Sequence, residues 1–331
     1  MTAKVSGQRV TGKARTKVAR DMAAEFYMIM YRARRFEEEV FEFYKRGLMP
    51  GLAHLYLGQE AVAVGACAAL RPDDYIGSTH RGHGHLVARG ADLNRMMAEI
   101  LGKKTGYSKG KGGSMHIMAM NKGILGANGI VGGGLPIATG AAYASKLRGD
   151  DKVTLAFFGD SACNQGTFHE SINMAAAWDL PIAFIIENNF YGISVDIRRV
   201  TKEHRLSKRA VGYGIPGVTI DGNDVFAVYD EVKKAVARAR NGKGPTLIEC
   251  LTYRWQGHHV GDPGEYRPKE EVTGWKANEP IGKLEKLGLL SKKEIAKIKT
   301  AVEEEIRLAC RFAEESPYPD AAEAFTDVFV Q

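Results

Sequence analysis

The sequence predicts an α/β fold with a doubly wound, mostly parallel sheet flanked by helices, and a helical C-terminal extension. Two short apolar runs, at 153–158 (VTLAFF) and 181–186 (PIAFII), have the length and composition of buried strands. The segment between them carries Phe168, Ile172 and Ala176 at helical spacing. Because a crossover helix returns the chain to the same end of a sheet, the two strands are expected to be parallel.

The N-terminal part of the chain is expected to be helical. Residues 21–46 repeat apolar side chains at intervals of three and four, and Gly47 and Pro50 then provide a stop signal. A second helix is expected at 59–70, where small and apolar residues dominate. Asp92 is placed to cap a third helix, because its carboxylate can accept backbone N–H groups of the first turn.

Strands and helices alternate through the rest of the chain. Residues 102–134 are dense in glycine, which predicts tight turns or close approach of the backbone to a ligand. A helix of small residues is expected at 135–147, a long basic loop at 196–209, and strands at 218–220 and 245–255. Asp224 is expected to cap a helix that runs to about residue 240, and Ser291 with Glu294 forms a capping box for the last long helix.

Composition and charge exclude several classes of protein. The chain has 331 residues and a net charge of +7, yet its basic residues are interspersed with acids and no nucleic-acid motif accompanies them, so we expect no nucleic-acid partner. No apolar run approaches the ~18 residues of a membrane span. The first twenty residues are basic and acid-free, which predicts a mobile arm, with an organellar transit peptide as the alternative. The four cysteines form no C-x-x-C pair, which is typical of reduced thiols in a cytoplasmic protein.

Polar residues follow each of the two central apolar runs. Asp160 comes after the first run and Asn189 after the second, and in a doubly wound sheet such positions meet at the carboxyl ends of the strands. A carboxylate and an amide oxygen suit Mg²⁺, which takes its other ligands from phosphate and water. Asp160 could instead only cap the next helix, but its pairing with Asn189 favours a Mg²⁺-diphosphate site.

This pattern resembles the thiamine diphosphate motif, which runs from Gly-Asp-Gly to Asn-Asn. From about Gly51 to the C-terminal helix the chain resembles the alpha subunits of two-chain 2-oxo-acid dehydrogenases of the pyruvate type and of acetoin dehydrogenase. The matching stretches are GLAHLYLGQEA (51–61), STHRGHGH (78–85), KGKGGSMH (109–116), GANGIVGGGLP (126–136), GDSACNQG (159–166), ENNFYGIS (187–194) and YRWQGHHVGDPGEYR (253–267). The resemblance implies a thiamine diphosphate-binding fold with a flexible arm at 1–20, a diphosphate-binding α/β domain at 21–275 and a helical extension at 276–331 packed on the same domain.

The resemblance also implies which residues hold the cofactor. The side chains of Asp160 and Asn189 and the backbone carbonyl of Tyr191 would ligate Mg²⁺. The diphosphate would be lined by Ser161, Ala162 and Gly192, and the aminopyrimidine ring would be held at Gly129 and Val131 through backbone groups. Ser161 departs from the family motif, which has glycine there, but its N–H can still meet a phosphate oxygen.

Histidines are concentrated in two of the matching stretches. The spacing of His80, His83 and His85 invites a zinc interpretation, but a glycine-alternating loop supplies zinc geometry poorly, so a cationic diphosphate loop with Arg81 as the direct contact is the better account. Position 80 is tyrosine in many pyruvate-type relatives, whereas acetoin-type sequences more often carry the form seen here. His80 is therefore predicted to contact the cofactor and favours acetoin.

Two further histidines are predicted to be catalytic. His258 matches the catalytic-loop histidine of the family, which touches the diphosphate and helps with proton transfer. His54 is a second candidate, with a purely structural histidine as the alternative. His259 stands where mammalian pyruvate-type relatives have a regulatory serine, so phosphorylation there is ruled out.

The resemblance implies an oxidoreductase that is active only with a beta subunit, in a tetramer of two alpha and two beta chains. The beta subunit would supply the glutamate that activates the cofactor. Acetoin or pyruvate would give a hydroxyethyl-thiamine adduct, and the acetyl group would pass to a lipoyl acyltransferase partner. Branched-chain 2-oxo acids remain open as substrates, as does a catalytically silent scaffold subunit. We expect the basic stretch 196–209 and the loop 257–267 to flank the entrance and to become ordered when the cofactor binds.

Overall fold

The computed structural model describes the backbone of residues 12–329 and the side chains from residue 19 onward. The residues 1–11 of the predicted arm lie outside this part. Helix α1 spans Gly12–Lys45, so the helix expected at 21–46 begins earlier and takes in the second half of that arm.

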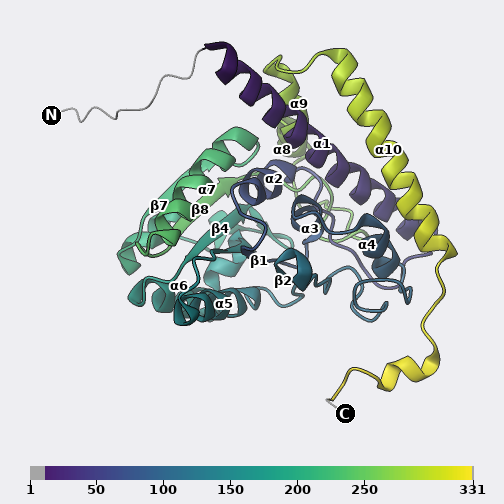
Figure 1. Ribbon diagram of the computed structural model, residues 1–331, viewed down its shortest axis with the longest axis horizontal. Coiled ribbons are helices and arrows are strands. Elements are labelled where there is room, and N and C mark those ends of the chain that lie inside the picture. The colour runs from purple at the N-terminus through teal and green to yellow at the C-terminus, as the bar shows by residue number, and fades with distance from the viewer. Residues whose placement is uncertain (1–11, 330–331) are drawn as a thin grey trace.

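A six-stranded sheet forms the centre of the molecule (Figure 1). Its strand order is β2-β1-β3-β4-β8-β7, and every pairing between neighbours is parallel. The strands are β1 (Tyr75–Gly77), β2 (Ile124–Gly126), β3 (Thr154–Gly159), β4 (Ile182–Asn188), β7 (Gly217–Asp221) and β8 (Thr246–Leu251). The two strands expected to be neighbours, β3 and β4, are paired in parallel along their length, which confirms the predicted crossover.

Helices cover both faces of the sheet, as the doubly wound prediction requires. The helices α5 (Gly134–Arg148) and α6 (Gly166–Ala177) pack on one face, where Phe158 and Phe184 meet Phe168. On the other face, α2 (Glu60–Ala68) and α7 (Val225–Arg240) pack over Phe157 and Ile185. Because successive side chains of a strand point to opposite faces, the consecutive Phe157 and Phe158 enter different cores.

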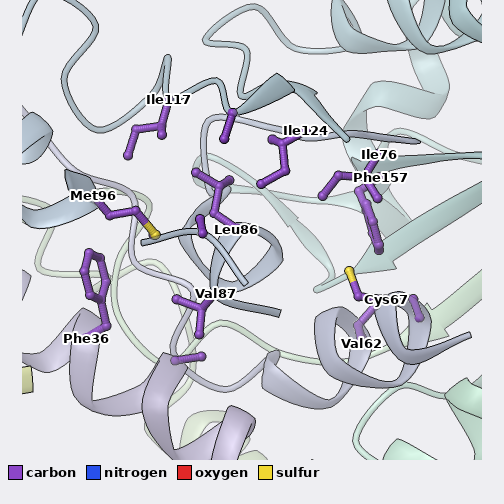
Figure 2. Packing of buried hydrophobic residues seen from close by; sticks show 14 of the residues in the cluster. Phe36, Val62, Cys67, Ile76, Leu86, Val87, Met96, Ile117, Ile124 and Phe157 are labelled. Atoms are coloured by element: carbon purple, nitrogen blue, oxygen red, sulfur yellow. The ribbon is translucent and has the colours of Figure 1, made fainter. Parts of the chain in front are cut away.

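The larger core continues from the sheet into the N-terminal helices (Figure 2). Phe36 of α1 and Met96 of α4 (Leu93–Ile100) lie near one another, and Leu86 and Val87 of α3 (His83–Ala88) fill the space toward the sheet. Asp92 caps α4 through the N–H groups of Asn94 and Arg95, as expected. This packing fixes the chain that leads to residues 78–81, which enter the site described below.

The C-terminal helices pack against α1 (Figure 1). The helix α10 (Lys292–Glu315) opens with the predicted capping box of Ser291 and Glu294 and contacts α1 along its length, with a bidentate ion pair between Arg32 and Glu305. The helix α9 (Pro280–Lys286) joins the same cluster through Ile281. These contacts support the proposal that the extension packs on the α/β domain, although the division of the chain into domains stays a prediction.

Two expected elements differ in the structure. Residues 196–209 are not one open loop, because β6 (Val195–Asp196), the 3₁₀ turn η3 (Ile197–Arg199) and the start of η4 (Leu206–Tyr213) interrupt them. The Asp196 carboxylate accepts the N–H of Arg198 and so initiates the first turn. The strand expected at 245–255 ends at Leu251, and the helix α8 (Lys269–Ala277) follows the loop after it. The other 3₁₀ turns of the described residues are η1 (Met120–Lys122), η2 (Asp160–Asn164) and η5 (Ala321–Phe325).

Candidate active site

A cavity of about 300 Å³ opens at the carboxyl ends of β1, β3 and β4. This is the edge of a doubly wound sheet where ligands bind. Its wall contains ten of the residues singled out from the sequence, namely His80, Arg81, Val131, Asp160, Ser161, Ala162, Asn189, Tyr191, Gly192 and His258. Segments that are far apart in the chain therefore converge on a single site.

Asp160 and Asn189 lie side by side at the ends of the two central strands. The backbone N–H of Asn189 donates to Oδ1 of Asp160 at 3.3 Å. Burial raises the pKa of the Asp160 carboxyl to about 6, although the N–H groups of Asp160 itself and of Asn189 oppose the shift. The Asn189 amide nitrogen donates to Oε1 of Gln59 at 3.1 Å. A buried carboxylate with no cationic side chain bonded to it is suited to a metal ion.

A tight hairpin carries the third predicted ligand. The strands β5 (Tyr191–Gly192) and β6 pair antiparallel, and Phe190 and Ile193 on either side of β5 have φ angles of 69° and 53°. Positive φ is costly for bulky side chains and is often found at functional sites. The carbonyl of Tyr191 accepts a hydrogen bond of 3.3 Å from Nη1 of Arg254. The backbone of the hairpin is thus held at the cavity wall.

Ser161, which stands where the family motif has glycine, fits without backbone strain. Its φ is not positive, and its hydroxyl lies in the space that a side chain at Gly192 would fill, since a Cβ there would come within 2.0 Å of Oγ. The hydroxyl also donates to Oδ2 of Asp160 at 3.3 Å. The extra side chain is accommodated because residue 192 is glycine.

The glycine-rich segment before α5 forms another wall of the cavity. Asn128, Ile130 and Val131 line it, and Ile130 is 73% exposed. Gly129 is not among the lining residues, and a Cβ on it would lie 3.2 Å from the ring of His116. The structure therefore brings Val131 to the site but places Gly129 behind the wall.

The imidazole rings of His54, His80 and His258 form a cluster. The ring centroid of His54 lies 4.7 Å from that of His80 and 4.8 Å from that of His258. Burial, and then the charge of Arg81, lower the pKa values of these histidines to about 2 for His54, about 3 for His80 and about 4 for His258. All three imidazoles are therefore neutral near pH 7, which is the state required of a proton acceptor.

Arg81 connects the histidines to one another. Its guanidinium donates to the carbonyl of Leu55 at 2.7 Å and to the carbonyl of His258 at 2.9 Å. Burial lowers its pKa to about 9. Arg81 thus holds the segment of His54 and the loop of His258 against each other at the cavity.

The other histidines of the HRGHGH stretch lie elsewhere. His83 contacts Glu37 at 3.0 Å, and His85 contacts Glu187 at 3.0 Å and Ser78 at 2.8 Å. Both are buried on α3. The spacing that invited a zinc interpretation therefore does not gather these histidines with His80.

Residues 28–322 match the family model described as dehydrogenase E1 component. The chain belongs to this family. It is 49% identical over 313 residues to the alpha subunit of acetoin:2,6-dichlorophenolindophenol oxidoreductase of Bacillus subtilis, covering 94% of each chain. The corresponding subunit of Cupriavidus necator is 45% identical over 92% of this chain and 93% of its own. The alpha subunit of the pyruvate dehydrogenase E1 component of Rhizobium meliloti is 40% identical over 99% of each chain.

Dehydrogenase E1 components are thiamine diphosphate-dependent oxidoreductases, and the site of this family member fits that cofactor. Within the part of the chain that the structure describes, the buried Asp160 carboxylate has no cationic partner bonded to it and accepts hydrogen bonds only from N–H and O–H groups. A Cβ on Gly159, which precedes it, would meet nothing within 4 Å. Such a carboxylate beside open space at a strand end is a suitable ligand for a metal-bound diphosphate.

The sequence reasoning missed one residue of the site of this E1 component. Arg254 is 1% exposed and lines the cavity. It donates to the carbonyls of Tyr191 and Ile193 and to the hydroxyl of Tyr266, and it lies 3.3 Å from Nδ1 of His258. Arg254 lies in the segment 245–255, which the sequence predicts to be a strand. Charged residues are rarely buried without partners, so an arginine in that segment was the available signal.

Among the described residues, no helix has the length and apolar composition needed to cross a membrane. The four cysteines, Cys67, Cys163, Cys250 and Cys310, are all free thiols.

Proposed function

We propose that this chain is the alpha subunit of an acetoin dehydrogenase first component, which uses thiamine diphosphate and Mg²⁺ and works with a beta subunit. The observation that carries the proposal is the buried pair Asp160 and Asn189 at adjacent strand ends in the wall of the cavity. Asp160, Asn189 and the carbonyl of Tyr191 would hold the metal, and Ser161, Ala162 and Gly192 would line the diphosphate. Val131 would flank the ring at the opposite wall, with Gly129 behind it.

Thiamine diphosphate, when bound, supplies the nucleophilic carbon and the electron sink for cleaving a bond next to a carbonyl. The chain contributes orientation and proton handling. His258 and His54 are neutral near pH 7 and can accept or return a proton at an imidazole nitrogen. His80 faces the same space, and Arg81 fixes the His258 loop through its carbonyl.

The site calls for a second chain. The carboxylates in the cavity wall are Asp160 and Glu187, and Glu187 is bonded to Tyr56 and His85. Neither is available to activate an aminopyrimidine, so a beta subunit would supply that glutamate, in a tetramer of two alpha and two beta chains. The names of the relatives as alpha subunits support this. The exposed Ile130, Val131 and Ile137 offer an apolar rim for such a partner.

Acetoin is favoured as the substrate by the relatives and by His80. The two acetoin-type relatives share 49% and 45% of their residues with this chain, against 40% for the pyruvate-type relative of Rhizobium meliloti. His80 adds a neutral imidazole to the cavity wall, which suits an uncharged hydroxyketone. The acetyl group would then pass to a lipoyl acyltransferase.

The free thiols are in keeping with a protein that works in the reducing cytoplasm.

Dye-linked oxidation by the purified alpha–beta complex tests the proposal. Acetoin, pyruvate and a branched 2-oxo acid are compared, each with and without thiamine diphosphate and Mg²⁺. We expect cofactor-dependent turnover with acetoin as the preferred substrate. Preference for pyruvate would move the chain to the pyruvate dehydrogenase type, and no turnover by an assembled complex would leave a scaffold role.

A further inference from the structure

We propose that His54, His80 and His258 form a binding site for a transition metal ion of the Zn²⁺ class, distinct from the Mg²⁺ site, and that its occupation blocks turnover. One ring nitrogen from each residue lies within 4.8 Å of the others. Three histidines with an open fourth position are a common ligand set for zinc. The inference does not depend on which substrate the enzyme uses.

The geometry requires the three rings to move closer together. Nitrogens bound to one zinc ion at about 2.0–2.1 Å lie about 3.3 Å apart, so ring nitrogens that lie within 4.8 Å of one another must approach by up to about 1.5 Å. His80 and His258 are half-buried and border the cavity, and His54 is 8% exposed.

An unpartnered nitrogen points to a missing ligand. Nδ1 of His54 is buried and makes no hydrogen bond within the described residues. Most buried polar atoms in proteins are paired, so an orphaned one calls for an explanation. The imidazole rings of His80 and His258 lie against that of His54, and a shared cation would satisfy its nitrogen together with theirs.

The charges around the three histidines determine how such an ion would be bound. The lowered pKa values of the three histidines leave their lone pairs free of added protons near pH 7, as metal binding requires. The charges of Arg81 and Arg254 oppose a bare divalent cation. An anion in the fourth position, such as hydroxide or chloride, offsets this repulsion, and the cavity next to the rings leaves room for it.

The two metal sites differ in the ions they select. Asp160 and Asn189 offer oxygen, which suits Mg²⁺, whereas imidazole nitrogen suits Zn²⁺, Co²⁺ and Cu²⁺. Excess Mg²⁺ is therefore expected not to displace an ion from the histidines. Because His54 and His258 also serve the reaction, an ion on them removes their proton-accepting nitrogens.

The test uses Co²⁺ as a coloured probe for the Zn²⁺ site in the complete alpha–beta complex, with Mg²⁺ in excess. We expect each alpha chain to bind one Co²⁺ ion tightly and to show the intense visible absorption of low-coordinate cobalt. Zn²⁺ should displace the ion and abolish this absorption. His80→Gln should weaken Co²⁺ binding by about tenfold or more, because it removes one of three ligands. His259→Gln is the matched control, since that neighbouring ring is outside the ligand set, and should bind as the unmodified complex does.

Thermal unfolding of His80→Gln checks that the variant is folded. Absence of the absorption band, or equal Co²⁺ affinity in His80→Gln and the unmodified complex, would overturn the proposal. So would a loss in His259→Gln as large as that in His80→Gln. Because Co²⁺ binding is read without turnover, this result is independent of whether acetoin is oxidised.

Discussion

The backbone N–H of Asn189 donates to the carboxylate of Asp160 and ties together the ends of two neighbouring parallel strands. The contact sets the carboxylate and the amide that are proposed to ligate the metal within one hydrogen bond of each other. It exists because β3 and β4 are in register, with Gly159 opposite Glu187. The candidate metal site is thus a direct product of the sheet topology.

Replacing Asp160 by asparagine should abolish tight Mg²⁺-dependent cofactor binding. The change keeps the shape of the side chain but removes the charge, and loss of a ligand should cost at least the ~100-fold found for outer-shell partners. Calorimetric titration of the alpha–beta complex with thiamine diphosphate and Mg²⁺ measures it. Asp230→Asn, on the exposed surface of α7, is the control, and equal weakening in both variants would refute the assignment.

Ser161 and Gly192 should behave as a coupled pair. Gly192→Ala places a methyl group where the Ser161 hydroxyl lies, and we expect it to weaken cofactor binding or stability by about 1–3 kcal/mol through overpacking. Adding Ser161→Gly removes the clashing atoms and should restore most of the loss. The readout is a double-mutant cycle; simple additivity of the two changes would show that the residues do not share this space.

The neutral His54 should make stability depend on pH. Its pKa is about 2 in the folded chain against an ordinary 6.5, so the unfolded state binds more protons between these values and stability falls as pH drops below about 6.5. At pH 5.5 the protonation of this group in the unfolded state lowers the free energy of unfolding by about 1.4 kcal/mol. Unfolding midpoints at pH 7.5 and 5.5 measure the slope, which His54→Gln should reduce and the surface change His204→Gln should not. An unchanged slope in His54→Gln would contradict the burial of a neutral imidazole.

Glu99 should be essential for the glycine-rich loop. Its buried carboxylate accepts the N–H groups of Ser108, Gly110, Gly112 and Gly113 at 2.7–3.1 Å. Glu99→Gln turns an amide nitrogen toward two of these donors and should lower the free energy of unfolding by about 2–4 kcal/mol. Denaturant unfolding and hydrogen exchange at 108–113 would show it. Glu304→Gln, which breaks an exposed ion pair, should cost about 0.5 kcal/mol or less.

Much of the fold was predictable because its signals are local. The apolar runs that form β3 and β4 and the caps Asp92, Asp224 and Ser291 are all where the sequence indicates. The strands β1 and β2 were missed because each has only three residues, too few to show a period. Their pairing is decided by neighbours in the sheet rather than by their own sequence.

The candidate site was predictable in its residues but not in its grouping. Asp160 and Asn189 follow from strand ends, which topology brings together. The cluster of His54, His80 and His258 depends on long-range contacts, such as the hydrogen bond from Val260 to the carbonyl of Ala53 and those of Arg81. No periodicity or spacing encodes such contacts, and the same holds for the role of Arg254.

A structure of the alpha–beta complex with thiamine diphosphate and Mg²⁺ tests the central claim most directly. The account predicts a metal ion bonded to the carboxylate of Asp160, the amide oxygen of Asn189 and the carbonyl of Tyr191, at about 2.0–2.1 Å from each. The diphosphate should lie against Ser161 and Gly192. A cofactor bound in another cavity, or a metal held without Asp160 and Asn189, would contradict it.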